Sequence, residues 1–450
     1  MEPTRRRSWR LDLLFYGVGL AFAAGNAIFS EFYGYRVWGN FATAGYLIAF
    51  VLTVLQASSR MPPTVRSRWS PVGVAGLLAG VVPLLVLVFV RDPGFVWGRW
   101  PWAFPSQPEV WVVERSARLL LDNGTPYPDL SLLGRPPVPD DYTPYGPGMT
   151  IFGLPRALFG DSPFTDARIA FAVGTVLLVA LALKVMGRPR VPVLAAQLAA
   201  VSPLTLLTIT VAGDDIPVIA LIVLAAALAF RAGSFGGPIT SGLAIALVIN
   251  MKLTALPALL VLAIAVFAAR GRRALLIFFG TVIITSAVLV LPVLLVDPAA
   301  FVEHVILFPA GLGEAGSPAA SPLPGHLIAQ LGPIGHAASL ALLAAAACAI
   351  TVWLVVRPPR DPADVMLRTA VGLGTAIVLA PATRWGYLVY PLAMAGAMLA
   401  FSTAEPKEAR EEGTRTAAGP TDGDHDVTHD DAYEGLNRPI ASPDARGSQA

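Results

Sequence analysis

The sequence predicts an all-α integral membrane protein with about 12 transmembrane helices and a large first loop outside the cytoplasm. Three observations support this class: 55% of the 450 residues are hydrophobic, only 14% are charged, and apolar runs recur along the chain. Soluble domains carry about 25% charged residues, so this composition excludes nucleic-acid binders and disordered proteins. The single cysteine, Cys348, excludes an internal disulfide and a cysteine-rich metal site.

Twelve apolar segments are candidates for helices that cross a hydrocarbon core about 30 Å thick. They are 11–30, 41–57, 71–90, 165–185, 190–211, 215–231, 238–250, 253–269, 273–296, 335–356, 367–382 and 386–402. The seventh and eighth segments are short for spanning helices. The stretch 148–163 is shorter still and is interrupted by prolines, so we expect it to be interfacial or re-entrant.

The distribution of basic residues sets the expected orientation. With the N-terminus in the cytoplasm, the inner connections hold 17 lysine and arginine residues against four acids, whereas the outer ones hold 10 against 15. Positively charged connections stay in the cytoplasm. We therefore expect a multi-pass protein of the cell (plasma) membrane with both termini inside and its chemistry outside. The first apolar run lacks a small-residue cleavage site, so we expect no cleavable signal peptide.

This predicted arrangement across the membrane divides the chain into three regions. Residues 1–70 form a basic N-terminal segment with two additional helices, and residues 71–402 form the transmembrane core. Two long outer loops, 91–164 and 297–334, belong to the core, and loops of this length are often functional. Residues 403–450, with 11 acids and five bases, predict a disordered acidic cytoplasmic tail.

The large outer loop contains one clear helical pattern. Residues 108–123 read PEVWVVERSARLLLDN, with apolar residues at helical spacing, which predicts an amphipathic helix on the outer leaflet that ends before Gly124. Glu109 lies in its first turn, where a carboxylate interacts favourably with the helix dipole. The spacing alone therefore favours a helix-start acid at this position.

Aromatic and acidic residues follow in the same loop. Tyr127, Tyr142 and Tyr145 lie between prolines and predict stiff, aromatic-lined turns. Such turns stack on sugar rings or lipid headgroups, but an interfacial aromatic belt has the same sequence pattern. Asp140 and Asp141 are either paired oxygen ligands for a divalent cation or solvated loop acids.

Charged residues also lie at the outer ends of three predicted helices. Asp214 and Asp215 open the segment 215–231, as acids at a helix start commonly do. Lys252, in NMKLTALP, is a charge at membrane depth, which indicates either a functional site or a side chain that reaches the outer surface. Arg384, in TRWGYLVYP, either holds a lipid phosphate or anchors its helix at the interface.

These segments resemble a known family. EVWVVERSARLLLDNGTPYPD and DDYTPYGPGMTIFGLPRALFGD are similar to the first outer loop of GT-C-fold membrane glycosyltransferases, in particular glycosyltransferase family 87, which is polyprenyl-phosphate-mannose-dependent. GDDIPVIALIVLAAALAFRAG, INMKLTALPALL and TRWGYLVYP are similar to its later helix pairs. The resemblance, over roughly 70–400, implies a GT-C-like helical core. It also implies an enzyme that moves a hexose, with mannose expected, from a polyprenyl-phosphate donor to a lipid or cell-envelope glycan outside the cytoplasm.

The resemblance also implies roles for individual residues. Glu109 stands where the family commonly has an aspartate and becomes the general base, with Glu114 and Asp92 as alternatives. Lys252 and Arg384 would bind the donor phosphate. Tyr127, Tyr142, Tyr145, Asp214 and Asp215 would line the substrate site. No metal is expected, unless a divalent cation takes part at Asp140 and Asp141. A single base with direct displacement predicts inversion at the anomeric carbon.

Two other classes remain open at this point. A secondary transporter with twelve helices would usually show internal repeats, which are not found here, and the longest loop follows the third helix. A non-catalytic membrane protein with a degenerate site is allowed by the glutamate at position 109. The expected partners are membrane lipids, the lipid-linked donor and the acceptor, and not nucleic acid.

Overall fold

The computed structural model describes residues 3–58, 67–91, 106–231, 236–316 and 318–404. These residues form α-helices and short 3₁₀- or π-helical turns, with no β-strand among them, which confirms the predicted all-helical class. Asp92 and the predicted tail beyond Ala404 lie outside the described residues.

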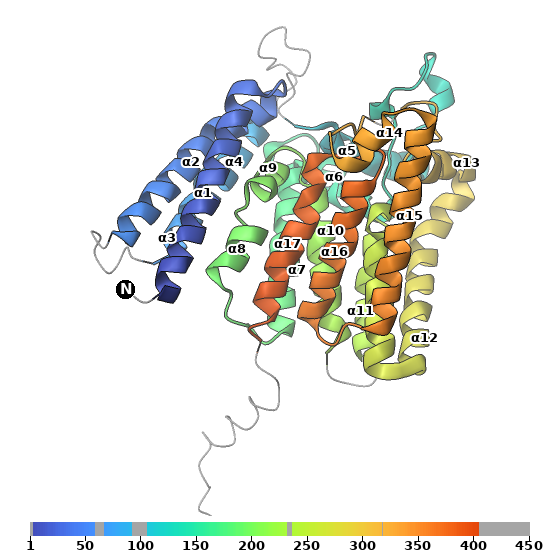
Figure 1. Cartoon of the computed structure of the whole chain (residues 1–450). Coiled ribbons are helices and arrows are strands. Elements are labelled where there is room, and N and C mark those ends of the chain that lie inside the picture. The colour runs from blue at the N-terminus through green and yellow to red at the C-terminus, as the bar shows by residue number, and fades with distance from the viewer. Residues whose placement is uncertain (1–2, 59–66, 92–105, 232–235, 317, 405–450) are drawn as a thin grey trace, which may run out of the picture. The chain divides into compact units, whose positions relative to one another are not determined.

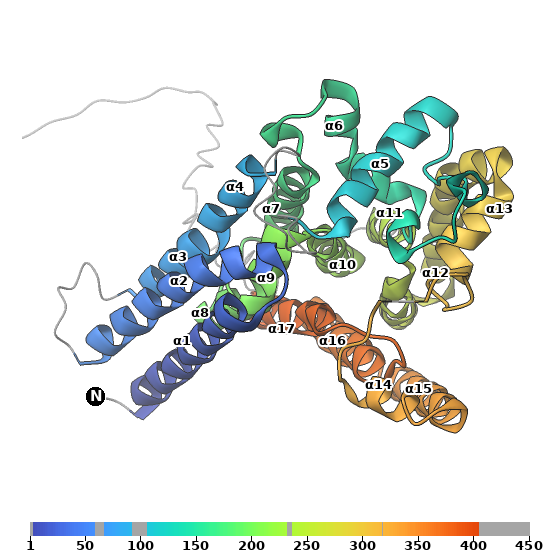
Figure 2. The same cartoon turned by 90° about the horizontal axis from the view of Figure 1, so that it is seen from above.

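The N-terminal helices pack as a group. Helix α1 (Pro3–Phe29) pairs with α2 (Tyr33–Ala57), and α2 also packs on a run made of α3 (Trp69–Gly76), a π-helical turn and α4 (Val82–Phe89). Figures 1 and 2 show these helices beside α8 (Val193–Ala199) and α9 (Pro203–Val211). Pro83 has no N–H to donate to the Ala79 carbonyl. The Trp38 indole takes that place, because its Nε1 donates to Ala79 O at 2.8 Å.

The rest of the bundle consists of spanning helices and short connecting ones. The helices are α5 (Pro108–Asn123), α6 (Leu154–Phe159), α7 (Ala167–Val185), α8 (Val193–Ala199), α9 (Pro203–Val211), α10 (Asp215–Ala229), α11 (Gly236–Ile249), α12 (Leu256–Val296), α13 (Pro298–Phe301), α14 (Pro324–Ala329), α15 (Pro333–Val356), α16 (Pro362–Leu379) and α17 (Val389–Phe401). Helix α12 is interrupted at Gly271, whose φ of 77° separates the two predicted segments 253–269 and 273–296.

Seven helices in the described part of the chain are long and apolar enough to cross a membrane, or eight if a bent pair counts as one span. This supports a multi-pass membrane protein but does not confirm 12 spanning helices. Helices α10, α11 and α17 contain only 15, 14 and 13 residues. A perpendicular crossing needs about 20.

One predicted helix is wrong as a continuous element. The segment 190–211 forms two helices, α8 and α9, which are bent by 42°. Pro203 cannot donate a backbone hydrogen bond, and Ser202 instead caps α9 by accepting from the Thr205 N–H at 3.1 Å. The local chemistry of Ser202 and Pro203 therefore starts a new helix inside a uniformly apolar stretch.

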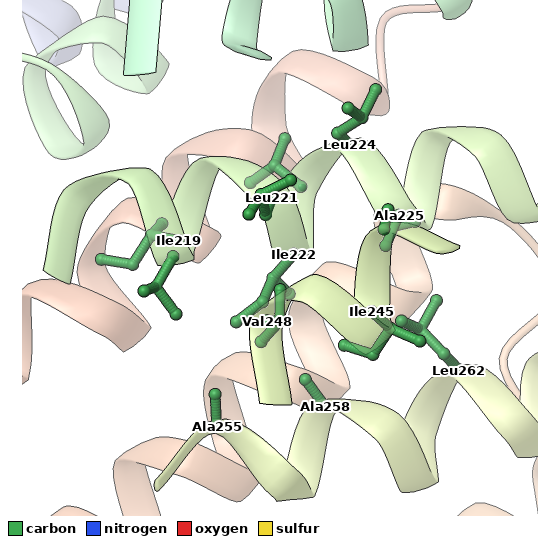
Figure 3. Packing of buried hydrophobic residues seen from close by; sticks show 14 of the residues in the cluster. Ile219, Leu221, Ile222, Leu224, Ala225, Ile245, Val248, Ala255, Ala258 and Leu262 are labelled. Atoms are coloured by element: carbon green, nitrogen blue, oxygen red, sulfur yellow. The ribbon is translucent and has the colours of Figure 1, made fainter. Parts of the chain in front are cut away.

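The centre of the bundle is α10, which has every residue buried. A helix that is apolar on all sides is buried either in a protein core or in lipid, and α10 is covered by protein, because it packs against α7, α11, α12, α16 and α17. Figure 3 shows Ile222 near Val248, with Ile245 near Leu262. The first residue of this central helix is Asp215, so the fold places a carboxylate inside the protein.

Candidate active site

The predicted charged residues meet at one end of the bundle. Glu109 comes from the first turn of α5, Asp214 and Asp215 from the start of α10, Lys252 from the connection between α11 and α12, and Arg384 from the connection between α16 and α17. Glu109 interacts electrostatically with Asp214 and with Arg384. The structure thus joins into one polar site residues that are up to 275 positions apart.

A buried lysine organises the inner half of this site. Lys252 is 9% exposed, and its Nζ donates to Asp214 Oδ2 at 2.8 Å and also to Asp215 Oδ1. The Tyr145 hydroxyl donates to Asp214 Oδ2 at 3.1 Å, and the Tyr390 hydroxyl donates to Asp215 Oδ1 at 2.7 Å. The lysine charge is therefore already compensated by two carboxylates.

Two further tyrosines of this site, Tyr387 and Tyr390, were not among the predicted site residues. The Lys252 ammonium lies 5.6 Å from the ring centroids of both Tyr145 and Tyr387, within the range of cation–π interactions. Tyr387 lies in the 3₁₀-helical turn Trp385–Leu388, and Tyr390 is the second residue of α17. Residues that are three apart along a helical segment lie on one face. That spacing was the available signal, but an interfacial aromatic belt explains it equally well.

The outer half of the site is an ion pair. Arg384 Nη1 donates to Glu109 Oε1 at 2.6 Å, with side-chain exposures of 33% and 19%. The other oxygen, Glu109 Oε2, is buried and has no hydrogen-bond partner among the described residues. Burial raises the pKa of Glu109, and the neighbouring Arg384 opposes that rise. A carboxylate with a raised pKa and an unoccupied oxygen can accept a proton from a bound hydroxyl.

The second outer loop fixes the position of Arg384. The Thr383 N–H donates to Ala319 O at 2.9 Å, and the Ser321 N–H donates to Thr383 O at 2.9 Å. The Trp385 N–H donates to Ser321 Oγ at 3.0 Å. The residues before and after Arg384 are thereby both bonded to the segment 319–321, which holds the Arg384 side chain toward α5.

A tight backbone approach places Tyr145 over Lys252. The Gly146 N–H donates to Met251 O at 3.1 Å, and the Gly148 N–H donates to Asn250 O at 2.9 Å. A Cβ atom on Gly146 would overlap the Asn250 carbonyl oxygen. Glycine is therefore required at this position for the outer loop to reach the lysine.

Gly146→Ala is expected to weaken both stability and activity, because overpacking of this kind costs about 1–3 kcal/mol and moves Tyr145 away from Lys252. Thermal unfolding and an activity assay measure the two effects. Gly73→Ala is the matched control, since no atom lies within 4 Å of its added Cβ. Wild-type stability and activity in Gly146→Ala would contradict the role of this approach.

The other two predicted tyrosines pack between the outer loops. Tyr142 is buried and stacks on Phe308 with ring centroids 4.0 Å apart, while Tyr127 stacks on His304 at 5.5 Å. His304 Nδ1 accepts from the Thr143 N–H at 3.0 Å, so its Nε2 donates to a backbone carbonyl. Burial lowers the pKa of His304 to about 4. These contacts support the loop that carries Tyr145, whose backbone carbonyl accepts from the Tyr127 hydroxyl at 3.1 Å.

Glu114 has a different environment from Glu109. Arg91 donates to both of its carboxylate oxygens at 2.7 Å, and the Ala167 N–H donates to Oε1 at 2.9 Å. Arg91 also donates to Asp166 Oδ2 at 2.7 Å. Glu114 is buried, although its position in the predicted helix lies off the apolar stripe. Its contacts tie α5 to α7 and thus fix the helix that carries Glu109.

This buried network contains residues that the sequence prediction missed. Arg168 is fully buried and donates to both oxygens of Asp166 at 2.9 Å. It also donates to Thr210 O at 3.2 Å and to Leu87 O at 3.3 Å. An arginine inside the predicted span 165–185 was the available signal, because a charge at that depth usually has a specific partner.

The paired acids of the loop are held by arginines. Arg135 donates to both carboxylate oxygens of Asp141, at 2.7 and 2.8 Å, and Arg115 donates to the backbone carbonyls of Asp140 and Asp141. Among the described residues, no group of three or more histidines, cysteines or acids is placed to hold a metal ion. A cation at Asp140 and Asp141 stays a prediction.

The fold and the site together define a multi-pass helical membrane protein with a charged site at one end of its bundle. The model of glycosyltransferase family 87 matches residues 142–381. The chain belongs to this family and is a membrane glycosyltransferase. The matched range includes Asp214, Asp215 and Lys252, whereas Glu109 and Arg384 lie outside it. Searches of curated proteins and of solved structures return no match.

Proposed function

We propose that this glycosyltransferase moves mannose from a polyprenyl-phosphate donor to a lipid or cell-envelope glycan outside the cytoplasm, with inversion. The observation that carries the proposal is the Glu109–Arg384 pair. One oxygen of Glu109 is held by Arg384, and the other is buried without a partner among the described residues. A transfer from a phosphate-activated sugar needs these two functions, a proton acceptor and a cation.

The proposed reaction is a single displacement. The acceptor hydroxyl oxygen forms a bond to the anomeric carbon, and Glu109 Oε2 takes its proton. The bond between that carbon and the phosphate oxygen breaks, and the polyprenyl phosphate leaves with the electron pair. Inversion follows because retention needs a second carboxylate as nucleophile, and Asp214, which interacts with Glu109, is engaged by Lys252 and Tyr145.

The two cations of the site have unequal access to a donor phosphate. Arg384 is one-third exposed, whereas Lys252 lies buried between two carboxylates. We therefore assign the direct phosphate contact to Arg384, whose planar group can bind an anion through two N–H donors. Lys252 contributes positive potential and holds Asp214 and Asp215 in place.

The proposed side of the membrane follows from charge. The site lies at the helix ends opposite the connections that carry the basic clusters, such as 184–190 and 270–273. Basic connections remain in the cytoplasm. This supports an extracytoplasmic active site in the cell membrane, open to a donor lipid in the outer leaflet.

Arg384→Gln is expected to raise the KM for the donor by about 10- to 100-fold, the range for losing a hydrogen bond to a charged group. Its loss also raises the pKa of Glu109 further, because Arg384 is the neighbour that opposes the effect of burial. Since the base must be deprotonated, the acid limb of the pH–rate profile moves to higher pH. Steady-state kinetics across pH check both effects.

Two arginine variants control this experiment. Arg384→Lys keeps the charge and should recover part of the donor affinity. Arg118→Gln removes an exposed arginine of the same outer region, 59% exposed, and should leave donor KM unchanged. Equal donor KM values in Arg384→Gln and wild type would remove Arg384 from the phosphate site.

A donor panel tests the proposal as a whole. Purified protein is offered polyprenyl phosphates carrying mannose, glucose or galactose, and donor binding and slow donor hydrolysis are measured. Hydrolysis of the mannose donor alone supports the proposal. Hydrolysis of a different donor would identify the sugar of that donor as the one transferred. Binding without turnover would point to a degenerate site, and solute flux in vesicles would favour a transporter.

A further inference from the structure

The N-terminal helix pair reaches the candidate active site, although it lies outside the matched range 142–381. Tyr35 is in the first turn of α2, and its hydroxyl accepts a hydrogen bond from Gln107 Nε2. Gln107 directly precedes α5 and is two residues before Glu109. The first turn of one helix therefore contacts the residue that begins the helix of the candidate base.

Tyr35 also lies near the Glu109–Arg384 pair, close enough for both charges to act on its hydroxyl group. The backbone of Gln107 is held separately, because its N–H donates to Val211 O at the end of α9 at 2.8 Å. The start of α5 is thus fixed from two sides, through its backbone by α9 and through the Gln107 side chain by α2.

The helix pair is attached firmly enough to the core to act as a fixed support. Arg68 donates to both oxygens of Asp12 in α1 at 2.7 Å, and Gln197 of α8 donates to Asp12 Oδ1 at 3.0 Å. Farther along α2, the Tyr46 hydroxyl donates to Val201 O at 2.8 Å. These buried contacts hold α1 and α2 against α8 and α9 at several points, so the loss of any one of them leaves Tyr35 in place.

We propose that Tyr35 is a positioning residue for sugar transfer, and that the N-terminal helix pair forms one side of the active site. By holding Gln107, Tyr35 sets the first turn of α5 so that Glu109 faces Arg384. This inference rests on the proposed role of Glu109 as the base.

Tyr35→Phe in the full-length protein tests the inference. The turnover number is expected to fall by about 3- to 10-fold, the range for losing one neutral hydrogen bond. The acid limb of the pH–rate profile should move to higher pH, because a displaced Glu109 pairs less well with Arg384, the neighbour that lowers its pKa. The donor KM should change little, since Arg384 keeps its place.

Tyr46→Phe is the matched control. It removes a hydroxyl hydrogen bond from the same helix, between α2 and Val201, and should lower the unfolding temperature without moving the pH–rate profile. Gln107→Leu removes the other partner of Tyr35 and should reproduce the Tyr35→Phe effect. The double variant should then lose little more activity than either single variant, because both changes remove the same hydrogen bond.

The outcomes separate this inference from the proposed function. If wild type transfers sugar, Glu109→Gln does not, and Tyr35→Phe has a wild-type pH–rate profile, the positioning role is wrong. An equal shift of the pH–rate profile in Tyr46→Phe would also overturn the positioning role, since the loss of any hydrogen bond from α2 would then have the same effect. If Glu109→Gln retains full transfer, the proposed function of Glu109 fails and the inference fails with it.

Discussion

Glu109→Gln is expected to lower sugar transfer by about 100- to 10,000-fold, the usual contribution of a general base. Glutamine keeps the size of the side chain and can still contact Arg384, but it cannot take a proton from the acceptor hydroxyl. Donor binding should persist, because Arg384 is unchanged. Single-turnover transfer and donor binding, measured on the same preparation, separate the two quantities.

The control for this variant lies on the same helix. Asp122→Asn removes an exposed carboxylate from the last turn of α5 and should leave transfer unchanged. Glu114→Gln should instead lower stability, because it disturbs the contacts with Arg91 and Ala167. If Glu109→Gln and Asp122→Asn transfer sugar equally well, Glu109 is not the base.

Lys252→Met is expected to destabilise the protein by about 3–5 kcal/mol, the cost of removing one partner of a buried ion pair. Methionine fills similar space but leaves Asp214 and Asp215 buried without their shared cation. The expected result is a large fall in unfolding temperature in detergent. Donor binding should weaken along with it, since Tyr145 and Tyr387 both lie against the lysine.

Two further variants define the cause of this effect. Lys184→Met removes an exposed lysine at the other end of the bundle and should leave stability unchanged. Adding Asp215→Asn to Lys252→Met should recover part of the lost stability, because one buried charge is removed. A Lys252→Met protein of wild-type stability that fails to bind donor would instead make Lys252 a direct phosphate ligand.

Local structure was predicted well where interactions between near neighbours in the chain decide it. Helix α5 occupies residues 108–123 as expected, because Pro108 suits a first turn and Gly124 adopts the left-handed φ of 75° that ends a helix. The bend between α8 and α9 was missed, although Ser202 and Pro203 carry its signal. A uniformly apolar stretch hides such a break, since both helices are equally favourable in lipid.

The residues of the candidate site were predicted, but which of them contact one another was not. Glu109, Asp214, Asp215, Lys252 and Arg384 were all named as candidates, and the family resemblance implied their roles in catalysis or binding. Their partners were not: Glu109 and Arg384 are 275 residues apart, and Lys252 and Asp214 are 38 apart. Spacing could not separate Glu109 from Glu114, because both stand on one helix and only their surroundings differ.

The sequence by itself determined the membrane class, the all-helical structure and the family, since these depend on composition, on apolar runs and on motifs that are contiguous in the chain. Only the tertiary structure decided which charges meet. It shows that Lys252 is shared by two aspartates, that Glu114 is occupied by Arg91, and that Tyr35 reaches the start of α5. The physical reason is that ion pairs and buried hydrogen bonds act over a few ångströms in space, whereas sequence patterns report only neighbours along the chain.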